Sequence, residues 1–463
     1  MSRLKESRWK VLLPLASLVA VGAALVAATA SASPNAQAPL KLAILSDCQG
    51  AFGAFYEADI GGAQAAFMKF GHGKPVDAKK PSAGMNGIVL GGRQVKIVGY
   101  GCSNDTAAKA ISETKRLMEK LGADIMIGPL SGDEGIAVAN YAKAHPTKTF
   151  LNGTSGAQDT TLKVRAPNFF RFNGDGAQWS AGLGDVAVNR LGWKKAAAIA
   201  DDYSFAWTSS GGQIAEFCAL GGQITKRVYP PLNTTDYSSY VAQLPPPSQV
   251  DGYFWAVGGA GLVPSLKAFE QRFGPLPKGK FIGNLFWSDP LQYKELSDRV
   301  SGAFASGPTD GELQTPAAKG YVASIQKAYP SLVAGASSVF TYNYYNAAWA
   351  LSAALKGLRG DVGTNQSKLQ KALATTKLPQ AGYGPVKLDA NRNAIAPNFV
   401  QQLQTDSAGK LIVKNVLAYP AVDQSFGGTF TPSTPPPGRK FPTCKKKSLP
   451  WAGKGKVLAP IQK

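Results

Sequence analysis

Residues 41–70, KLAILSDCQGAFGAFYEADIGGAQAAFMKF, contain the pattern that decides the fold. The apolar run at 42–45 has the length and composition of a buried parallel strand. A loop with two glycines follows at 50–53, and Ile60 and Phe67 then recur at helical spacing. A purely structural turn would explain this segment equally well on its own. In parallel α/β sheets, however, ligands bind beyond the carboxyl ends of such strands.

The order of apolar run, small-residue loop and helical pattern then repeats in two successive series. Strands are expected at 94–99, 123–127 and 149–152 in the first series, and at 195–200, 224–229, 253–257 and 280–283 in the second. This alternation predicts an α/β protein with two doubly wound parallel sheets. Residues 71–92 read as an exposed insertion. The long helical patterns at 317–329 and 338–358 are too few for a third sheet, so we expect them to cover the first two.

The first 32 residues are typical of a secretory signal. A basic segment at 3–10 precedes an apolar run at 11–26, and small residues follow. Cleavage is expected after Ala30 or Ala32, which would place the mature protein in the periplasm. A retained membrane anchor is the alternative, but Pro14 and the Ala-x-Ala ending favour removal. No later stretch of the sequence approaches 18 apolar residues.

The chain is basic, with a formal net charge of +21 at pH 7. Eight lysine and arginine residues and no acid lie after residue 425. A basic tail could contact nucleic acid, but an exported protein rarely meets any. We therefore expect no nucleic-acid partner. Residues 426–463 are interpreted as a basic, irregular tail that is either solvated or in contact with anionic surface polymers.

Four cysteines in an exported chain indicate two disulfides, and three pairings are possible. Cys48 and Cys102 each follow an apolar strand, and neighbouring strand ends lie within bridging distance. This placement favours Cys48–Cys102, which leaves Cys218–Cys444 to attach the tail to the body. Metal binding is the alternative, but no CxxC spacing supports it.

Catalytic signatures are largely missing from the sequence. The two histidines, His72 and His145, are expected at the surface, and the sequence has no P-loop, HExxH or GxSxG motif. A hydrolase that uses Ser131 or Ser155 is a rival hypothesis, but no base accompanies either serine. We expect a protein that is not an enzyme and that needs no cofactor and no metal.

Two loops combine glycine with small hydroxyl residues just before an expected helix, namely Ser131-Gly132 and Thr154-Ser155-Gly156. Free backbone N–H groups at a helix start, aided by hydroxyls, make an anion site that suits a carboxylate. Ordinary helix capping explains either loop taken singly. Two such loops at one sheet edge, near residues 50–55, favour ligand binding.

Seven landmarks in this order resemble the leucine/isoleucine/valine-type solute-binding proteins of ABC importers, which are type I periplasmic binding proteins. They are the opening unit with Gly50, Phe55 and Gly62-Ala63, then IGPLS at 127–131, NGTS at 152–155, FR at 170–171, LGWKK at 191–195, DDYSF at 201–205 and GYGPV at 382–386. The resemblance extends from about residue 40 to about residue 419.

The resemblance implies two Rossmann-like lobes joined by three hinge crossings. Lobe 1 would comprise 38–163 and 289–376, and lobe 2 would comprise 164–288 and 377–425. A small molecule would bind between the lobes, which close on it, and an ABC permease in the membrane would recognise the closed form. The protein is expected to act as a monomer.

The family pattern, with the aromatic residues around it, implies a ligand site. Its expected residues are Phe55, Ser131, Gly132, Thr154, Ser155, Gly156, Tyr203, Phe205, Gly259 and Phe286. Further aromatic walls are expected from Phe52 and Trp287.

The sequence departs from the family pattern near Leu285, where amino-acid binders of this family place an acid that pairs the ammonium group of the ligand. An unpaired buried ammonium is costly. Asp133 or Asp202 could replace that acid; otherwise the ligand lacks an α-ammonium group. We therefore expect an importer component that binds a carboxylate, aromatic or branched, or an amide, although an amino-acid-like solute stays open. The alternative is an extracytoplasmic receptor module that senses its ligand without transport.

Overall fold

The computed structural model describes residues 37–309, 312, 315–332 and 334–462. The expected signal sequence at 1–32 therefore lies outside the described residues. Residues from Ala38 onward belong to one unit of the structure. Within the described chain, no helix combines the length and the apolar character needed to cross a bilayer.

The first sheet has six strands in the order β4-β5-β1-β6-β7-β8. Their bounds are β1 Leu40–Asp47, β4 Ile88–Leu90, β5 Arg93–Ser103, β6 Ile125–Ile127, β7 Thr149–Leu151 and β8 Phe169–Phe170. All neighbours run parallel except β4, which is antiparallel to β5. Seven of the eight residues of β1 are buried, as expected for a strand covered on both faces.

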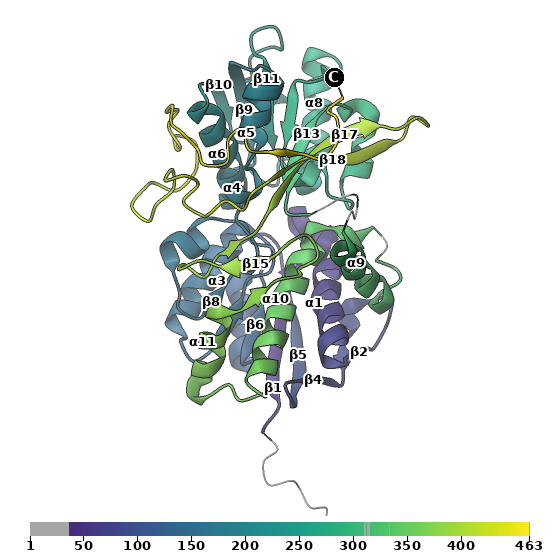
Figure 1. Ribbon diagram of the computed structural model, residues 1–463, viewed down its shortest axis with the longest axis vertical. Helices are drawn as coiled ribbons and strands as arrows, with labels where there is room; N and C mark the ends of the chain where they lie inside the picture. Colours follow the sequence, from purple (N-terminus) through teal and green to yellow (C-terminus); the bar gives the residue numbers. More distant parts are fainter. Residues whose placement is uncertain (1–36, 310–311, 313–314, 333, 463) are drawn as a thin grey trace, which may run out of the picture. The chain divides into compact units, whose positions relative to one another are not determined.

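Helices cover both faces of this sheet (Figure 1). One face packs against α1 (Tyr56–Gly71), α9 (Pro316–Ala328) and α10 (Val339–Gly357), and the other against α2 (Ala107–Lys115) and α3 (Gly132–Ala144). Helices α1 and α10 touch most closely at Gly62, where a Cβ atom would lie 2.2 Å from the carbonyl oxygen of Thr341. The expectation that the late helices return to cover an earlier sheet is confirmed.

The second sheet has eight strands in the order β10-β9-β11-β12-β13-β17-β18-β19. Their bounds are β9 Lys195–Ala200, β10 Gln223–Val228, β11 Gly252–Ala256, β12 Phe281–Gly283, β13 Phe304–Gly307, β17 Asn398–Thr405, β18 Leu411–Tyr419 and β19 Lys456–Val457. The first five strands in this order are parallel, and the last three continue antiparallel. Helices α6 (Ser204–Ala219) and α8 (Leu262–Phe273) pack against this sheet.

The chain passes between the two sheets three times: from β8 to β9, from β13 to α9, and from the small sheet β14-β15-β16 to β17. The small sheet comprises β14 (Lys377–Leu378), β15 (Val386–Leu388) and β16 (Ala394–Ile395). The predicted α/β architecture with three crossings is therefore confirmed.

A buried polar network joins the first and last passages. Arg171 and Asn393 pair along the backbone, and the Arg171 guanidinium donates to the Asn393 side chain at 2.5 Å. Asp175 lies 3.7 Å from the same guanidinium. Burial lowers the pKa of Arg171 to about 10, against the opposing effect of Asp175. Breaking this network would leave a buried charge without compensation.

Two short strands pair with the sheet of the other lobe from the one to which the expected lobe boundaries assign them. β8 lies within 164–288 but pairs with β7 of the first sheet, and β13 lies within 289–376 but pairs with β12 and β17 of the second. Pairing is decided by the neighbours that a strand meets at a crossing, which local sequence does not encode. The division into two lobes remains a proposal on this point.

One local prediction was wrong in detail. The insertion at 71–92 is only partly exposed, because Met85, Ile88 and Leu90 join the first core. The stretch 176–190 is divided into α4 (Gly176–Trp179), α5 (Leu183–Asp185) and a π-helical turn, with an interruption at Gly182, which has φ 98°.

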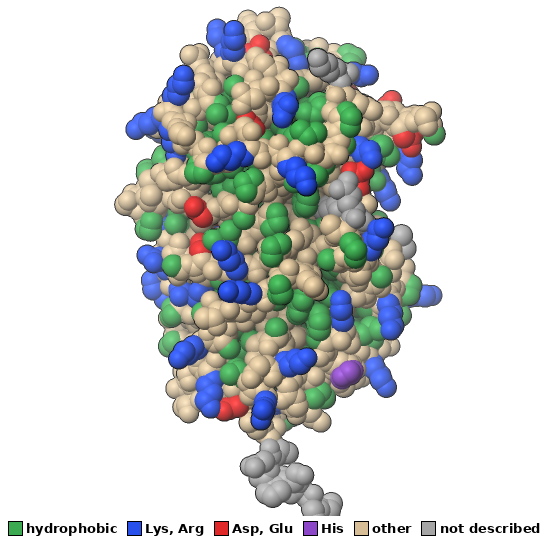
Figure 2. Space-filling view, viewed as in Figure 1, with side chains coloured by type: hydrophobic (Ala, Val, Ile, Leu, Met, Phe, Trp, Pro, Cys, Tyr) green, Lys and Arg blue, Asp and Glu red, His purple; other side chains and the backbone are tan. Residues whose placement is uncertain are grey.

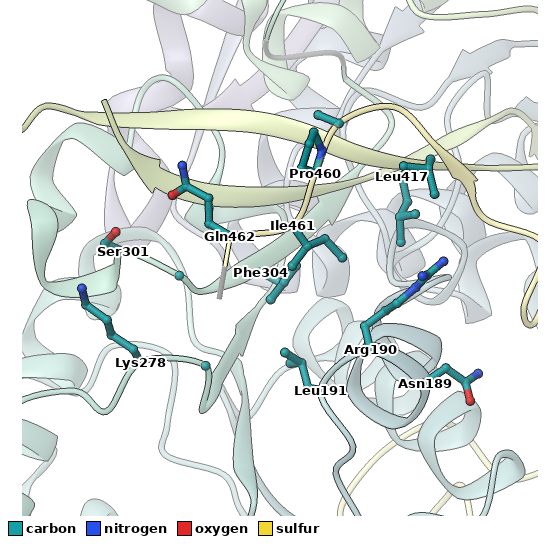
Figure 3. Close-up of a pocket in the computed structure, with 14 residues that line it drawn as sticks. Asn189, Arg190, Leu191, Lys278, Ser301, Phe304, Leu417, Pro460, Ile461 and Gln462 are labelled. Atoms are coloured by element: carbon teal, nitrogen blue, oxygen red, sulfur yellow. The ribbon is translucent and has the colours of Figure 1, made fainter. Parts of the chain in front are cut away.

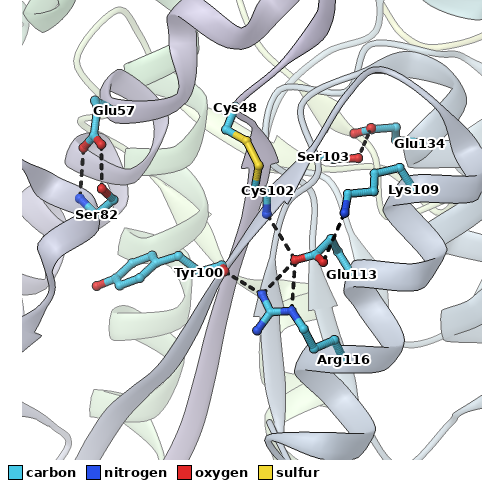
Figure 4. The surroundings of a disulfide bond; sticks show 10 residues. All are labelled: Cys48, Glu57, Ser82, Tyr100, Cys102, Ser103, Lys109, Glu113, Arg116 and Glu134. Atoms are coloured by element: carbon cyan, nitrogen blue, oxygen red, sulfur yellow. Dashed lines mark hydrogen bonds and ion pairs between the residues drawn. A yellow bond between two sulfur atoms is a disulfide. The ribbon is translucent and has the colours of Figure 1, made fainter.

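Both favoured disulfides are present. Cys48 and Cys102 join the carboxyl ends of the paired strands β1 and β5 (Figure 4). Beside this bond the carboxylate of Glu113 accepts from the Cys102 amide at 3.2 Å and from Arg116 at 2.7 Å, which fixes α2 against β5. Cys218 of α6 pairs with Cys444 of the tail.

The C-terminal tail is packed against the body of the protein. Its aromatic residues Phe426, Phe430 and Trp451 are buried in the core beside α6, and β19 adds an edge strand to the second sheet. The expectation of a solvated tail is wrong for these residues because the apolar side chains outweigh the basic ones that surround them.

Candidate functional site

A cavity opens where the loops after β6 and β7 of the first sheet meet the loops after β9 and β12 of the second. Its volume is about 20 Å³, enough for about one water molecule. The residues that line it are Phe52, Leu130, Ser131, Gly132, Thr154, Gly156, Trp179, Tyr203, Phe205, Leu285, Phe286 and Phe340. The turns expected to bind a ligand therefore face a common space.

Seven of the ten predicted site residues line this cavity: Ser131, Gly132, Thr154, Gly156, Tyr203, Phe205 and Phe286. The other three lie just behind it. Phe55 stacks on Phe340 with a ring-centroid distance of 3.8 Å. The Ser155 hydroxyl points towards Gly135, and Gly259 packs on Ala51 and Phe52.

Five lining residues were not among the ten predicted. The sequence predicts Phe52 as an aromatic wall, and Leu285 is the position at which the sequence departs from the family pattern. Leu130 is the apolar residue directly before Ser131. Trp179 comes from α4 in the first crossing and Phe340 from the start of α10. No local motif marks these last two, since only the crossings bring them to the cavity.

Glycine allows the loops of the first sheet to touch α6. A Cβ atom at Gly132 would lie 2.6 Å from the Ser204 hydroxyl and 2.7 Å from the Phe205 amide nitrogen. A Cβ atom at Gly156 would lie 2.7 Å from the Phe205 ring. These approaches are closer than real Cβ contacts, so a side chain at either position would push the two sides of the cavity apart.

Aromatic rings from both sides fill most of the space around the cavity. Phe52 of the first side stacks on Phe286 of the second with centroids 5.6 Å apart, and it lies 5.7 Å from the Tyr203 ring. Phe205 meets Phe286 edge-on at 6.0 Å. Such ring pairs contribute about 0.5–1.5 kcal/mol each beyond the burial of their area. The two sides therefore attract each other through their rings.

Two hydrogen-bond donors on residues that line the cavity have no partner among the described residues, the Ser131 hydroxyl and the Trp179 indole N–H. The indole nitrogen lies towards Gly174, and the opposite edge of the ring lies towards Gly156 of the lining. Ser131 is 1% exposed and Trp179 is 4% exposed, so water does not readily replace the missing partner. Ser131 occupies the N-cap position of α3, yet its side chain makes no capping bond. The capping interpretation of this loop is thus not supported, and the hydroxyl is free to bind a ligand.

The second hydroxyl-bearing loop differs from the prediction. No helix starts directly after Gly156; the next helical segment begins at Thr160. The Asn152 side-chain amide holds the loop by donating to the Gly153 and Ser155 carbonyl oxygens. Thr154 donates to the Phe340 carbonyl oxygen at 3.4 Å. The loop contributes hydroxyl and backbone groups, but no helix N-terminus.

None of the twelve described residues that line the cavity carries a charge. Asp133 lies nearby and accepts from the Ser204 amide at 3.1 Å. Asp201 is buried and accepts from the Gly258 amide at 2.9 Å, and burial raises its pKa well above the ordinary value. Leu285 faces the cavity instead of an acid. The surroundings thus offer donors to an anion but no carboxylate to an ammonium group.

Three buried carboxyl groups, Asp47, Asp105 and Glu134, gather behind the cavity. Asp105 accepts from the Ala51 amide at 2.5 Å and so holds the turn that carries Phe52. Burial raises the pKa of Glu134 to about 7, and burial with the neighbouring carboxylates raises that of Asp47. Among the described residues no group of acids, histidines or cysteines is arranged to hold a metal ion.

His145 lies far from Ser131, one of the two serines of the hydrolase hypothesis. His145 is the C-cap of α3, whereas Ser131 is its N-cap, so the 13-residue helix separates them by about 20 Å. The His145 ring stacks on Tyr141 at 3.9 Å. The structure therefore does not pair this histidine with Ser131.

A larger cavity of about 490 Å³ lies at the other end of the second sheet (Figure 3). Pro460, Ile461 and Gln462 of the tail form one wall, and Leu191 and Phe304 lie opposite. None of the predicted site residues reaches it. This cavity is the larger of the two, but the smaller one is the candidate functional site because an unpaired donor lies in its lining.

Comparisons with known proteins agree with this fold. The chain is similar to a solute-binding protein of an ABC transporter from R. palustris in complex with benzoate (22% identity, TM-score 0.69, covering 83% of this chain and 97% of that one). A second R. palustris solute-binding protein, in complex with 4-hydroxybenzoate, has 18% identity and a TM-score of 0.71 over 83% and 98% of the two chains.

A leucine-binding protein from Thermotoga maritima is also similar, with 18% identity and a TM-score of 0.64 over 81% and 99% of the two chains. The search of curated proteins found no match. A model of the periplasmic binding protein family matches residues 39–410, from β1 almost to the start of β18. The chain passes three times between its two sheets, and the family model matches most of its length, so it belongs to the periplasmic binding protein family.

Proposed function

We propose that this protein is the substrate-binding component of an ABC importer and that its ligand is an aromatic carboxylate. The observation that carries the proposal is the uncharged cavity with the unpaired Ser131 hydroxyl set among aromatic rings. A carboxylate accepts such hydrogen bonds strongly even without a cation nearby. A flat ring suits the walls formed by Phe52 and Phe286.

The same cavity disfavours a standard amino acid. Leu285 contributes only hydrocarbon, so an α-ammonium group would be buried without a partner. Asp133 already accepts from the Ser204 amide, and Asp202 from Arg439 and the Trp207 indole. Similar proteins in complex with benzoate and 4-hydroxybenzoate support a ligand of this class.

Binding would require the two sides of the cavity to separate and close again. The cavity of about 20 Å³ is far smaller than a benzoate molecule, and the contacts of Phe286 with Phe52 and Phe205 occupy the space that a ligand ring would take. A bound ring would replace these ring–ring contacts with its own. Since ligand contacts from both sides exist only in the closed form, the ligand would shift the equilibrium towards closure.

The proposal extends to the setting of the protein. Membership of a periplasmic binding family fits an exported chain, and we propose cleavage of the signal after Ala30 or Ala32 and a periplasmic location. The partner would be an ABC permease in the membrane that recognises the closed form. We further propose that the protein works as a monomer.

A thermal-shift and calorimetry panel tests the ligand class. Benzoate and 4-hydroxybenzoate should raise the melting temperature by mass action. Benzamide lacks the carboxylate and cyclohexanecarboxylate lacks the aromatic ring, so their shifts show how much each group contributes. Leucine tests whether the site accepts an ammonium group. A shift with leucine that exceeds the shift with benzoate would overturn the proposal.

A further inference from the structure

The C-terminal tail runs beside the whole length of α6. Near the start of the helix, Arg439 forms an ion pair with Asp202. Near its end, Cys444 bonds to Cys218 and the Lys447 amide donates to the Ala219 carbonyl oxygen at 3.1 Å. One turn earlier in the helix, the Trp451 indole N–H donates to Glu216 at 2.7 Å.

The contact at the start of α6 reaches the ligand cavity. Asp202 is the residue before Tyr203, which lines the cavity together with Phe205 of the first helical turn. The Asp202 carboxylate accepts from the Trp207 indole at 3.0 Å and from Arg439. Its position is therefore set from one side by the helix itself and from the other by the tail.

The tail segment that carries Arg439 is itself anchored. The Gly438 carbonyl oxygen accepts from the Tyr229 hydroxyl at 3.3 Å, and the Pro442 carbonyl oxygen accepts from Arg227 at 2.6 Å. The Arg439 guanidinium also lies 5.7 Å from the centre of the Tyr229 ring. Arg227 of β10 and Tyr229 just after it thus hold residues 438–442 in place. The Arg439 side chain is 61% exposed where it meets Asp202.

The contact at the other end of α6 is buried. The Glu216 carboxylate is fully buried and accepts from the Gly182 amide, the Gly184 amide and Trp451. Burial raises the pKa of Glu216 to about 8, while these donors oppose the rise. Loss of the Trp451 donor would leave a buried carboxyl oxygen with poorer hydrogen bonding. Both ends of the helix therefore depend on the tail.

The tail lies beyond the residues that the family model matches. The family match ends at residue 410, and similar structures are covered over 97–99% of their own chains while covering 81–87% of this one. Lys and Arg side chains are spread over the visible face of the protein (Figure 2). The buried and paired groups of the tail are the ones that attach it to α6.

We propose that the C-terminal tail braces α6 and that Arg439 is a positioning residue for the ligand site, acting through Asp202 on Tyr203 and Phe205. The effect on affinity rests on the proposed function, whereas the effect on loop structure does not. Without the brace, the start of α6 would sample more positions, and a ligand would have to select the closed one.

The test compares Arg439→Met with Lys440→Met in the full-length mature protein. Lys440 is the next residue, is exposed, and is not part of the Asp202 contact. In protein labelled with 5-fluorotryptophan, the ¹⁹F resonance of Trp207, assigned with Trp207→Phe, should move or broaden in Arg439→Met only. Hydrogen exchange of amides 201–207 should rise in the same variant.

Benzoate affinity, measured by calorimetry, is the second arm. Arg439→Met should raise Kd by about threefold, the size expected of a partly exposed ion pair, and Arg439→Lys should recover most of the loss. Lys440→Met should leave Kd unchanged. Trp451→Phe, which removes only the indole donor, should also raise exchange in α6.

An unchanged Trp207 resonance and unchanged hydrogen exchange in Arg439→Met would contradict the proposal that the tail holds the start of α6 in place. A changed loop with an unchanged benzoate Kd would overturn its role in binding. Wild-type protein that binds no aromatic carboxylate would overturn the proposed function alone, because the resonance and exchange measurements still decide the brace.

Discussion

The ligand cavity and the acid cluster behind it, Asp47 with Asp105 and Glu134, are both buried, and both contain polar atoms without partners. At the cavity the unpaired atoms are donors, on Ser131 and Trp179. In the acid cluster they are carboxyl oxygens, which include both oxygens of Asp47. Buried carboxyl groups relieve their lack of partners by keeping protons, whereas buried N–H and O–H donors have no such route and need an acceptor. The difference separates the proposed ligand site from the acid cluster.

The largest effect is expected when an acid is introduced into the uncharged cavity, which then resembles the acid cluster. Leu285→Asp would place a carboxylate beside the bound carboxylate of the ligand, and like charges there cost several kcal/mol. We expect benzoate affinity to fall at least about 100-fold, as measured by calorimetry. Leu285→Asn has a similar shape without the charge and should lose much less. Equal losses in the two variants would show that charge does not select the ligand.

The acid cluster predicts a pH dependence of stability. Its carboxyl groups have higher pKa values in the folded protein than in the unfolded chain, so the folded state binds more protons. Stability should therefore fall as pH rises from 5 to 8, through the pKa of about 7 of Glu134. Asp47→Asn removes one charge from the cluster and should recover on the order of 2 kcal/mol of the unfolding free energy at pH 8.

Urea denaturation at pH 5, 6.5 and 8 measures this effect. Asp298→Asn, at an exposed aspartate, is the matched control and should leave the pH profile unaltered. Parallel profiles for wild type and Asp47→Asn would contradict the assignment of raised pKa values to this cluster.

A second test of the cavity removes one of its unpaired donors. Ser131→Ala should weaken benzoate binding by about tenfold, the value of a hydrogen bond to a charged acceptor. It should leave the melting temperature of the free protein nearly unchanged, because the hydroxyl makes no bond within the described chain. Ser112→Ala, at an exposed serine of α2, serves as the control. A large loss of stability in Ser131→Ala without loss of affinity would indicate a structural hydroxyl.

The smallest effect is expected at Phe55, which stacks on Phe340 behind the cavity without lining it. Phe55→Leu should cost about 1 kcal/mol of stability, the value of the ring pair, and should change benzoate affinity less than twofold. Phe286→Leu, inside the cavity, loses ring pairs with Phe52 and Phe205 and should lower both stability and benzoate affinity in the same calorimetric and denaturation measurements. Equal affinity losses would place Phe55 in the site after all.

Much of the cavity could be predicted because the chain repeats a local unit. Ser131 and Thr154 each follow a short apolar strand, and the carboxyl ends of parallel strands meet at one edge of a sheet. Local pattern is enough to bring such residues together. Trp179 and Phe340 could not be found this way, because each lies in or beside a crossing whose path depends on how whole sheets pack.

The tail shows the same limit in another form. Its many lysines suggested a solvated segment, yet Trp451 and Phe426 are buried against α6. Composition reports average polarity, but a few aromatic side chains and one disulfide decide where a segment lies. The favoured pairing of Cys218 with Cys444 was the one sequence signal that pointed to this attachment.

By itself, the sequence determined the alternation of strands and helices and the two loops that carry Ser131 and Thr154, and it favoured the pairing of Cys48 with Cys102, because each depends on neighbours along the chain or on strand ends that meet. Tertiary structure alone decided which donors were left without partners, which rings closed over them, and where the tail lay. Those outcomes depend on contacts between residues hundreds of positions apart, such as Arg439 with Asp202, and packing rather than local preference selects them.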